Sequence, residues 1–321
     1  MKINEKRLKS MKKVLITGVA GFIGSHIAQE LLKRDDVEII GIDNITSGLQ
    51  SNLDLLNSLD TDNKFTFHKL DIRDFEGMKE TLKDYGIDTI YHLAALVSVQ
   101  ESMDNPMKSG SINIQGTHNV LELARVLNIK RVIFSSSAAV YGDEPTLPKN
   151  ENSVVKPISP YGLEKSVGEQ YMRIYNEVYG LECVVFRYFN VYGERQDPAS
   201  DYSGVISIFN DKLKEAQTPM IFGDGKQYRD FVYVKDVARA NIAAMDMEDV
   251  SYELFCVGTG QKTSIYDVFT AFSARYDFSG EPIYKDGRTG DILASVCDNT
   301  KITEKLGIKD FHIFKDTIHN V

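Results

Sequence analysis

The sequence predicts an α/β fold in which a doubly wound parallel sheet of the Rossmann type is joined to a smaller, interleaved α/β lobe. The first observation behind this prediction is that apolar, strand-like runs alternate with amphipathic, helix-like stretches up to about Asn190. Such alternation is typical of a parallel sheet covered by helices on both faces. The second is a glycine-rich turn between the first strand-like run and the first helix-like stretch. Beyond Asn190 the alternation fails, which indicates the second lobe.

Each predicted strand is a short apolar run, and the predicted helices lie between such runs. The strands of the sheet are predicted at 14–17, 37–42, 65–68, 89–93, 131–134 and 182–186. The helices are predicted at 22–32, 75–85, 113–127 and 161–179. Two further strands are predicted at 231–234 and 254–257. We therefore expect a first domain over 1–189 with a return segment near 231–258, and a second, interleaved lobe over 190–321.

The glycine turn runs from Gly18 to Gly24 with the spacing G-x-x-G-x-x-G. A helix start presents unpaired N–H groups and the positive end of its dipole, and glycines let a pyrophosphate approach this backbone. We expect the turn to bind a dinucleotide through Gly18, Gly21, Phe22, Ile23 and Gly24. A tight turn that binds nothing is the alternative.

An acidic residue, Asp43, ends the second apolar run about twenty positions after the glycine turn. An acid at this spacing accepts a hydrogen bond from the ribose 2′-OH of NAD and repels the 2′-phosphate of NADP. No Arg or Lys lies between Ile39 and Gln50 to receive that phosphate. Asp43 and Asn44 therefore favour NAD over NADP, although an ordinary strand-end cap would also explain them.

Composition and charge exclude several classes of partner. The chain has 321 residues, of which 42% are hydrophobic and 26% charged, as in ordinary globular proteins. Its net charge of −9 argues against binding nucleic acid or an anionic membrane, since both favour basic surfaces. No apolar run is long enough to span a bilayer, and the polar, basic residues 1–10 are expected to be a disordered extension and not a secretory signal. Because Cys183, Cys256 and Cys297 lack zinc-binding spacing, we expect no metal and a reducing, cytoplasmic compartment.

Three serine hydroxyls, on Ser135, Ser136 and Ser137, follow the fifth predicted strand. Ligands bind beyond the carboxyl ends of the strands in open parallel sheets. We therefore expect these hydroxyls to face a ligand.

A tyrosine and a lysine begin the helix that follows the serine cluster. Ser159 suits the N-cap and Pro160 the first helical position, so Tyr161 and Lys165 are predicted four apart on one helix face. A lysine cation beside a phenol lowers the pKa of the phenol from about 10, and a general base works best when its pKa lies near the operating pH. We expect Tyr161 to take a proton from a sugar hydroxyl as hydride leaves the same carbon. A surface helix with an incidental Tyr and Lys is the alternative.

In this order, the glycine turn, Asp43, the serine cluster and Y-x-x-x-K resemble the extended short-chain dehydrogenase/reductase family, and within it the nucleotide-sugar 4-epimerases. The resemblance covers the chain from about Lys12 to Gly307. Its further pieces are the segments 71–74, 92–95, 186–193 and 223–230. These motifs are specific for the family and less specific for one substrate.

The resemblance implies roles for residues at matching positions. Tyr161 is implied as the acid/base, Lys165 as its tuner and a ligand of the nicotinamide ribose, and Ser137 as the hydroxyl that orients the sugar O4. The further cofactor contacts implied are Asn44, Asp71, Ile72, Leu93, Ala94, Ala95, Ser135, Tyr188 and Phe189. The substrate contacts implied are Asn190, Arg229 and Arg288 on the diphosphate, Asp291 on the nucleotide ribose, and Val205, Phe222 and Ser295.

Departures from the family pattern refine the expected activity. Related dehydratases carry an acidic pair after the serine, but Ser137 is followed by Ala138 and Ala139, which counts against a dehydratase or decarboxylase. Val97 stands where some epimerases have a lysine that touches the cofactor. Ser295 stands where members restricted to plain hexoses carry a tyrosine, so a 2-acetamido group is expected to fit; a small residue packed in a strand is the alternative.

We therefore expect an NAD-dependent 4-epimerase of UDP-hexoses, which accepts UDP-GlcNAc/UDP-GalNAc, UDP-Glc/UDP-Gal or both and passes through a transient 4-keto sugar. The resemblance also implies a homodimer. The alternatives are a nucleotide-sugar dehydratase or another enzyme that oxidises C4 transiently, a net dehydrogenase or reductase, and a dinucleotide-binding sensor without turnover.

Overall fold

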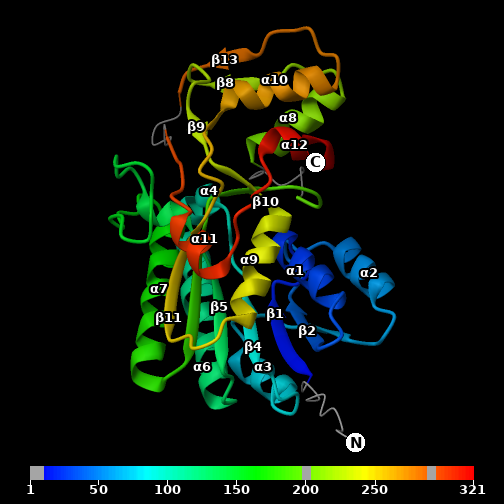
Figure 1. Ribbon diagram of the computed structural model, residues 1–321, viewed down its shortest axis with the longest axis vertical. Coiled ribbons are helices and arrows are strands. Elements are labelled where there is room, and N and C mark those ends of the chain that lie inside the picture. Colours follow the sequence, from blue (N-terminus) through cyan, green and yellow to red (C-terminus); the bar gives the residue numbers. More distant parts are fainter. Residues whose placement is uncertain (1–10, 197–203, 288–293) are drawn as a thin grey trace, which may run out of the picture.

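A seven-stranded parallel sheet forms the centre of the larger part of the molecule (Figure 1). The computed structural model describes residues 11–196, 204–287 and 294–321, so the predicted extension at residues 1–10 lies outside them. The strand order is β11-β6-β5-β4-β1-β2-β3, and every neighbouring pair is parallel, as predicted. The strands are β1 (Lys12–Thr17), β2 (Val37–Asp43), β3 (Phe65–Lys69), β4 (Thr89–His92), β5 (Arg131–Ser137), β6 (Glu182–Tyr188) and β11 (Tyr252–Val257).

Helices cover both faces of this sheet because each face is lined with apolar side chains. The first face packs against α1 (Phe22–Leu32), α2 (Gln50–Leu59), α9 (Val234–Asp246) and α11 (Thr300–Leu306). The second packs against α3 (Phe75–Leu82), α6 (Gly116–Val126) and α7 (Pro160–Tyr179). The chain passes from β3 to β4 across β1, which places a topological switch point beside the glycine turn. Such a switch point is the usual ligand site of an open α/β sheet.

A third apolar core belongs to the smaller group of elements at the top of Figure 1. It packs residues of β7 (Asn190–Tyr192), α8 (Val205–Lys214), β8 (Met220–Phe222), β10 (Phe231–Tyr233), α10 (Ile265–Arg275) and α12 (Phe314–Thr317). The strands β9 (Tyr228–Arg229), β12 (Thr263–Ser264) and β13 (Ile283–Lys285) complete the small sheets, and η3 (Ile318–Asn320) ends the chain. Because β11 returns to the large sheet, we propose that the two lobes are interleaved over the boundaries given above.

The helix predicted at 113–127 is observed as α6 (Gly116–Val126) and the end of the turn before it. The connection from β4 to this helix contains elements that the sequence did not predict. It consists of α4 (Val99–Asp104), α5 (Pro106–Gly110) and a turn of π-helix, η1 (Ser111–Gln115), and α6 begins only after this turn. The short 3-10 helix η2 (Ala138–Tyr141) follows β5. A π-helical turn inside a helix is frequent at functional sites.

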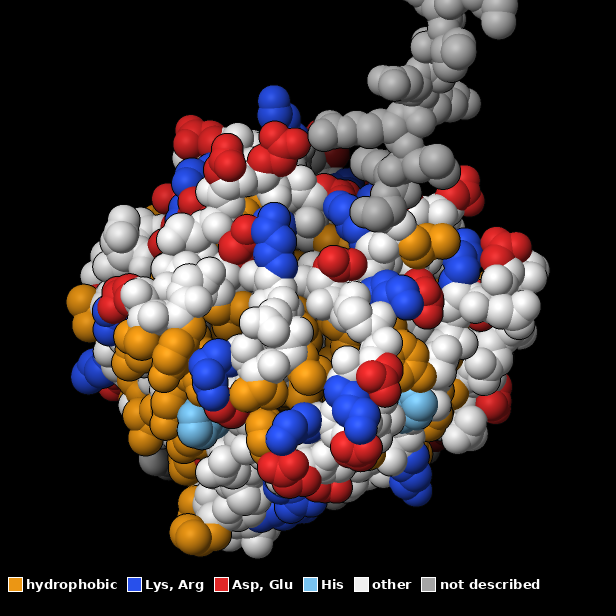
Figure 2. All heavy atoms as spheres, turned by 90° about the horizontal axis from the view of Figure 1, so that it is seen from below, with side chains coloured by type: hydrophobic (Ala, Val, Ile, Leu, Met, Phe, Trp, Pro, Cys, Tyr) orange, Lys and Arg blue, Asp and Glu red, His pale blue; other side chains and the backbone are white. Residues whose placement is uncertain are grey.

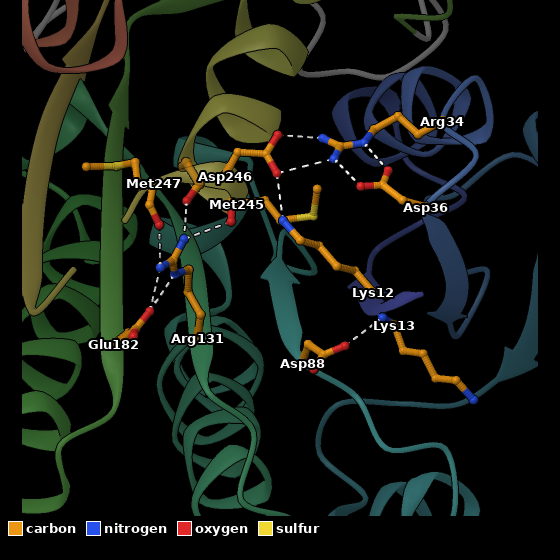
Figure 3. Close-up of polar contacts among 11 residues, drawn as sticks. Lys12, Lys13, Arg34, Asp36, Asp88, Arg131, Glu182, Met245, Asp246 and Met247 are labelled. Atoms are coloured by element: carbon orange, nitrogen blue, oxygen red, sulfur yellow. Dashed lines mark hydrogen bonds and ion pairs between the residues drawn. The ribbon is translucent and has the colours of Figure 1, made fainter. Parts of the chain in front are cut away.

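Polar contacts fasten α9 to the end of the sheet opposite the glycine turn (Figure 3). The guanidinium of Arg131 donates to three backbone carbonyls at the end of α9, those of Ala244 at 2.7 Å, Met245 at 2.9 Å and Met247 at 2.9 Å. The last carbonyls of a helix have no partner within it, so this cation satisfies them and complements the helix dipole. At the same end Asp246 accepts from Lys12 at 2.7 Å and also pairs with Arg34.

One face of α7 leaves apolar side chains uncovered. Leu163, Ile174, Val178 and Tyr179 are all exposed, and the first three lie at helical spacing. In Figure 1, α7 ends at the lower left of the molecule. Figure 2 views the molecule from below, and hydrophobic side chains gather at the left of this view. Across the described segments, no helix combines the length and the apolar character that crossing a membrane requires.

Candidate functional site

The three glycines after β1 leave the start of α1 open. Gly18 has φ +74°, and a Cβ there would lie 2.8 Å from the backbone N of Ala94. A Cβ on Gly24 would lie 2.2 Å from the backbone O of Gly18, so only glycine lets the helix pack this close to the turn. Gly21 is the N-cap, and no side chain caps the first N–H groups, which belong to Phe22 and its neighbours. An uncapped helix start with this geometry is a site for an anion.

Asp43 lies at the carboxyl end of β2, as predicted. Its Oδ2 accepts from the backbone N of Ala20 at 3.1 Å, and its Oδ1 accepts from the backbone N of Ile45 at 2.8 Å. Burial raises the pKa of Asp43, while these hydrogen bonds counter the shift. Each carboxylate oxygen accepts more than one hydrogen bond, so Asp43 keeps the capacity to bind a ribose hydroxyl.

Beside Asp43, a hydrogen-bonded group joins the ends of β2 and β3. Asn44 donates to Asp71 Oδ2 at 2.9 Å, and Arg73 donates to both carboxylate oxygens of Asp71 at 2.9 and 2.6 Å. The pairing with Arg73 holds the pKa of Asp71 well below its usual range. The charge of Arg73 is thus compensated by the Asp71 carboxylate. Asp43 therefore sets the charge at the position predicted for the ribose 2′-hydroxyl of NAD. Ile72 is buried between these residues and the second core.

The turn after β4 is held by a network that the sequence did not reveal. Thr17 Oγ1 accepts from the backbone N of Leu93 at 3.2 Å and of Ala94 at 3.1 Å, so its own proton goes to His92 Nδ1 at 2.8 Å. The other ring nitrogen of His92 then donates to Thr117 at 3.0 Å. Burial lowers the pKa of His92 to about 3, so the ring is neutral at pH 7. Thr17 and His92 both stand at the end of an apolar run. A polar residue at the end of a predicted strand was the signal in the sequence that could have pointed to this network.

After this turn, Ala95 is half-buried and Val97 is exposed. Leu93 and Ala94 are also half-buried. The backbone of this segment therefore lies at the ligand edge of the sheet, beside the glycine turn.

The start of α7 follows the prediction closely. Ser159 Oγ accepts from the backbone N of Gly162 at 3.1 Å, and Pro160 is the first helical residue. The helix start places Tyr161 and Lys165 one turn apart, and the side chains of both are buried.

Tyr161, Ser137 and Lys165 meet beyond the end of β5. The Ser137 side chain lies close enough to the Tyr161 hydroxyl to favour the charged form of the phenol. Lys165 Nζ donates to the backbone O of Ser135 at 2.8 Å and lies 5.8 Å from the centroid of the Tyr161 ring. This contact uses one of the three N–H donors of the ammonium group.

The net shift of the Tyr161 pKa is opposite to the lowering predicted from Lys165. Burial raises the pKa of Tyr161 to about 12; the Ser137 side chain opposes this shift, and the nearby Glu164 carboxylate adds to it. Burial likewise lowers the pKa of Lys165 to about 8. The reason is that the ammonium points to a backbone carbonyl and not to the phenol oxygen, so desolvation is the larger effect.

The serine cluster is divided between the ligand edge and the interior. Ser135 Oγ donates to the hydroxyl of Tyr188 at 3.3 Å, and Ser137 Oγ accepts from the backbone N of Ala139 at 3.1 Å. The expectation that Ser136 also faces a ligand is wrong, because its Oγ donates to buried Glu169 at 2.5 Å.

Tyr188 and Phe189 are buried at the end of β6. The hydroxyl of Tyr188 accepts from Asn241 Nδ2 at 2.7 Å, and burial raises the pKa of Tyr188 to about 12. Phe189 packs in a small apolar cluster with Tyr141 and Cys256. Their contact with a nicotinamide ring stays a prediction.

A cavity of about 390 Å³ lies in the smaller lobe and brings together four of the predicted substrate residues. Asn190, Val205, Phe222 and Arg229 line it from four different elements. Arg229 donates to the backbone O of Tyr228 at 3.0 Å. A guanidinium in a cavity suits the diphosphate of a nucleotide. The cavity also contains polar residues that the sequence did not single out: Gln196, Lys212 and Gln227.

The remaining predicted substrate residues are placed less fully. Ser295 is half-buried and its backbone N donates to the O of Tyr228 at 3.2 Å, so it lies beside Arg229 in the fold. Arg288 and Asp291 lie outside the described residues.

A buried carboxylate, Asp230, fixes this region. It accepts from the backbone N of Thr259, Gly260 and Cys297 at 2.8, 2.8 and 3.0 Å. Sequence reasoning did not select Asp230, although it ends the quoted segment 223–230 directly after Arg229.

Comparison with known proteins decides the family. The model of the NAD dependent epimerase/dehydratase family matches residues 14–258. The chain belongs to this family. The match confirms the family resemblance predicted from the sequence. It also confirms the prediction that the cofactor is NAD, which the name of the family states.

Relatives in this family cover nearly the whole chain. A UDP-glucose 4-epimerase from Mycolicibacterium smegmatis is 38% identical over 296 residues, which are 92% of each chain. The crystal structure of UDP-glucose 4-epimerase with UDP-glucose from Thermotoga maritima is 36% identical, with a TM-score of 0.88, and the match covers 95% of this chain and 96% of that one. The structure of UDP-N-acetylglucosamine 4-epimerase from Methanobrevibacter ruminantium in complex with UDP-N-acetylmuramic acid is 38% identical, with a TM-score of 0.89 and 97% coverage of both chains.

The residues of this epimerase/dehydratase family member fit NAD. The close packing of Gly18 and Gly24 and the uncapped start of α1 form a cradle for a pyrophosphate, which a Cβ would narrow. Asp43 offers acceptors to a ribose hydroxyl. The assignment of individual cofactor contacts remains a prediction.

Proposed function

We propose that the protein is an NAD-dependent 4-epimerase of UDP-hexoses that works through a transient 4-keto sugar. The observation that carries the proposal is that Tyr161 and Lys165 lie buried one helical turn apart on α7, with Ser137 beside them, at the ligand edge of the sheet that also holds the glycine turn. The comparisons support the same function, since relatives named 4-epimerases match the chain over more than nine-tenths of its length.

When bound, NAD supplies the acceptor and donor of hydride. Tyr161 takes the proton of the sugar 4-hydroxyl as hydride leaves C4, and Ser137 orients that oxygen. A phenol with a pKa of about 12 is neutral at pH 7, so its work as a base requires positive charge in the site, and the Lys165 ammonium supplies part of that charge. Tyr161 returns the proton when hydride comes back to the other face of C4, so net redox is zero.

The residues after Ser137 support epimerisation over dehydration. Ala138 and Ala139 form the first turn of η2 and carry no acid that could protonate a departing hydroxyl. Of the buried acids on α7, Glu164 turns toward Ser109 and Asn113, and Glu169 pairs with Arg187. A dehydratase remains the alternative, and its product would differ in mass.

The cavity in the smaller lobe is proposed to hold the UDP part of the substrate. Asn190 lies two residues after the end of β6, so the cavity begins close to the ligand edge of the sheet. Arg229 would bind the diphosphate, and Val205 and Phe222 would contact the nucleoside. Ser295 would leave room for a 2-acetamido group, so UDP-GlcNAc is proposed as a substrate besides UDP-Glc.

We also propose a homodimer and a cytoplasmic location. The exposed apolar face of α7, with Leu163, Ile174 and Val178, suits an identical face of a second copy. The three cysteines are buried free thiols, which fits a reducing compartment.

The test is to incubate the purified protein separately with UDP-Glc and UDP-GlcNAc and to resolve the products by NMR and mass spectrometry. We expect products of unchanged mass that are inverted at C4. Tyr161→Phe is expected to abolish turnover and retain NAD, whereas the control Tyr179→Phe, on the exposed face of the same helix, retains activity. A product of lower mass, or full activity of Tyr161→Phe, contradicts the proposal.

A further inference from the structure

We infer that Glu164 is a positioning residue of this site, whose carboxylate balances the buried Lys165 ammonium and anchors the turn after β4 through Asn113. The inference rests on the proposed epimerase function and deepens it. Neither the composition nor the quoted motifs single out Glu164, which stands between the tyrosine and the lysine of Y-x-x-x-K.

The contacts of Glu164 are those of a buried acceptor. The residue is 3% exposed. Its Oε2 accepts from Ser109 Oγ at 2.6 Å and from Asn113 Nδ2 at 2.7 Å. An amide nitrogen only donates, so the oxygen that it meets must accept. A buried carboxylate of this kind is costly unless a positive charge lies near it.

Of the two buried acids near Lys165, Glu164 is the one whose charge is not compensated by another cation of the described segments. Glu169, one turn further along α7, pairs with Arg187 of β6 at 2.6 Å, so these two charges compensate each other. Among the residues that the structure describes, neither Lys165 nor Glu164 forms an ion pair within 4.0 Å. Glu164 and Lys165 are adjacent in α7, and the charge of Glu164 favours the ammonium form of Lys165 against the effect of burial.

The other titratable groups near Lys165 are neutral at pH 7. His92 of β4 has its pKa lowered to about 3 by burial, and Tyr188 of β6 has its pKa raised to about 12. Burial also raises the pKa of Tyr141 of η2. The elements α4, α5 and η1 approach the start of α7 with Ser102, Ser109 and Asn113. The contact from α6 comes further along α7, where His118 stacks on Tyr171.

Asn113 extends the reach of Glu164 to the cofactor side of the sheet. Its Oδ1 accepts from the backbone N of Leu96 at 2.8 Å, and its Nδ2 donates to the backbone O of Leu96 at 2.9 Å. Asn113 lies in the π-helical turn η1, which gives it this position. One carboxylate therefore ties α7 to the turn 93–96, which holds three of the predicted dinucleotide contacts.

The test compares Glu164→Gln with the purified full-length protein. Gln keeps the shape and an acceptor for Ser109 and Asn113 but removes the charge. Loss of a negative charge destabilises the Lys165 ammonium, whose pKa is lowered by burial and raised by Glu164 and Glu169 to a net value of about 8. We expect the basic limb of the pH profile of kcat/KM to move toward acid by about one pH unit. The titration of Lys165, followed by NMR of lysine ε-carbons and assigned with Lys165→Arg, is expected to move equally.

Two control variants separate charge from shape. Glu177→Gln removes an exposed carboxylate from the same helix and is expected to leave both readouts unchanged. Glu164→Asp keeps the charge and is expected to keep the basic limb within a few tenths of a pH unit. If Glu164→Gln lowers kcat but moves neither the limb nor the lysine titration, the role is structural and the inference is overturned. If the unaltered protein does not epimerise, the proposed function fails, while the lysine titration still decides the charge balance.

Discussion

The three glycines of the turn after β1 have different surroundings, so substituting each by alanine separates folding from cofactor binding. Gly21 has φ −76°, which alanine adopts freely, and its Cβ would meet only the backbone O of Gly18 at 3.1 Å. Gly24→Ala would instead place a Cβ 2.2 Å from the same oxygen, and both atoms belong to rigid backbone. The Gly21 substitution therefore adds a methyl group at the open helix start, while the Gly24 substitution forces α1 away from the sheet.

The magnitudes follow from these contacts. We expect Gly24→Ala to lower the free energy of unfolding by about 3 kcal/mol, as overpacking against fixed backbone does. For Gly21→Ala the free energy of unfolding is expected to change by no more than about 1 kcal/mol, because alanine lowers the conformational entropy of the unfolded chain and this offsets the tight contact in the fold. NAD affinity of Gly21→Ala is expected to fall at least about tenfold, or about 1.4 kcal/mol, since the methyl group lies where a pyrophosphate approaches.

The assay combines urea unfolding with calorimetric titration of NAD into cofactor-stripped protein. Gly21→Ala that binds NAD as tightly as the unaltered protein would refute the role given to this turn. Gly24→Ala of unaltered stability would refute the packing argument for the third glycine.

Three further predictions test other parts of the account. Ser295→Tyr is expected to lose turnover of UDP-GlcNAc before that of UDP-Glc, and equal retention of both rates would show that Ser295 does not border the sugar. Arg187→Met leaves the Glu169 carboxylate buried without its cation and is expected to lower the free energy of unfolding by about 3–5 kcal/mol, measured with urea; a loss below 1 kcal/mol would contradict it. The buried rings of His26 and His92 have pKa values lowered to about 4 and about 3, so they stay neutral in the fold while the unfolded chain takes up protons below pH 6.5. Each is therefore expected to cost about 2 kcal/mol of stability between pH 7 and pH 5, and a flat pH dependence would exclude this effect.

Much of the larger sheet could be predicted because its strands are buried on both faces and read as continuous apolar runs. The predicted strand at 37–42 is β2, and the prediction of a helix at 22–32 matches α1. The helix predicted at 113–127 matches α6, but its first residues lie in the π-helical turn η1, where Asn113 contacts the backbone of Leu96. Local periodicity does not report such a tertiary contact. The helices α2 and α9 were missed, since the faces that they bury include polar residues, Asn52 in α2 and Asp236 and Asn241 in α9.

The site was predicted best where local rules decide the structure. Capping by Ser159 and Pro160 sets the start of α7, and helical spacing then aligns Tyr161 with Lys165. The direction of the pKa shift of Tyr161 could not be read in this way, because it depends on burial and on where the lysine nitrogen points.

Residues that act through contacts far apart in the sequence were also missed. Thr17 meets His92 across two strands, and Glu164 meets Asn113 across two helical elements. Spacing alone does not report such pairs, because it does not show which residues of different segments meet in the fold.

The transfer of hydrogen at C4 tests the central claim most directly. UDP-glucose that carries deuterium at C4 would be converted by the protein in ordinary water and the product examined by NMR and mass spectrometry. If hydride passes to bound NAD and returns to the same carbon while Tyr161 handles only the hydroxyl proton, the product retains deuterium at C4. Loss of that deuterium to solvent would contradict the account.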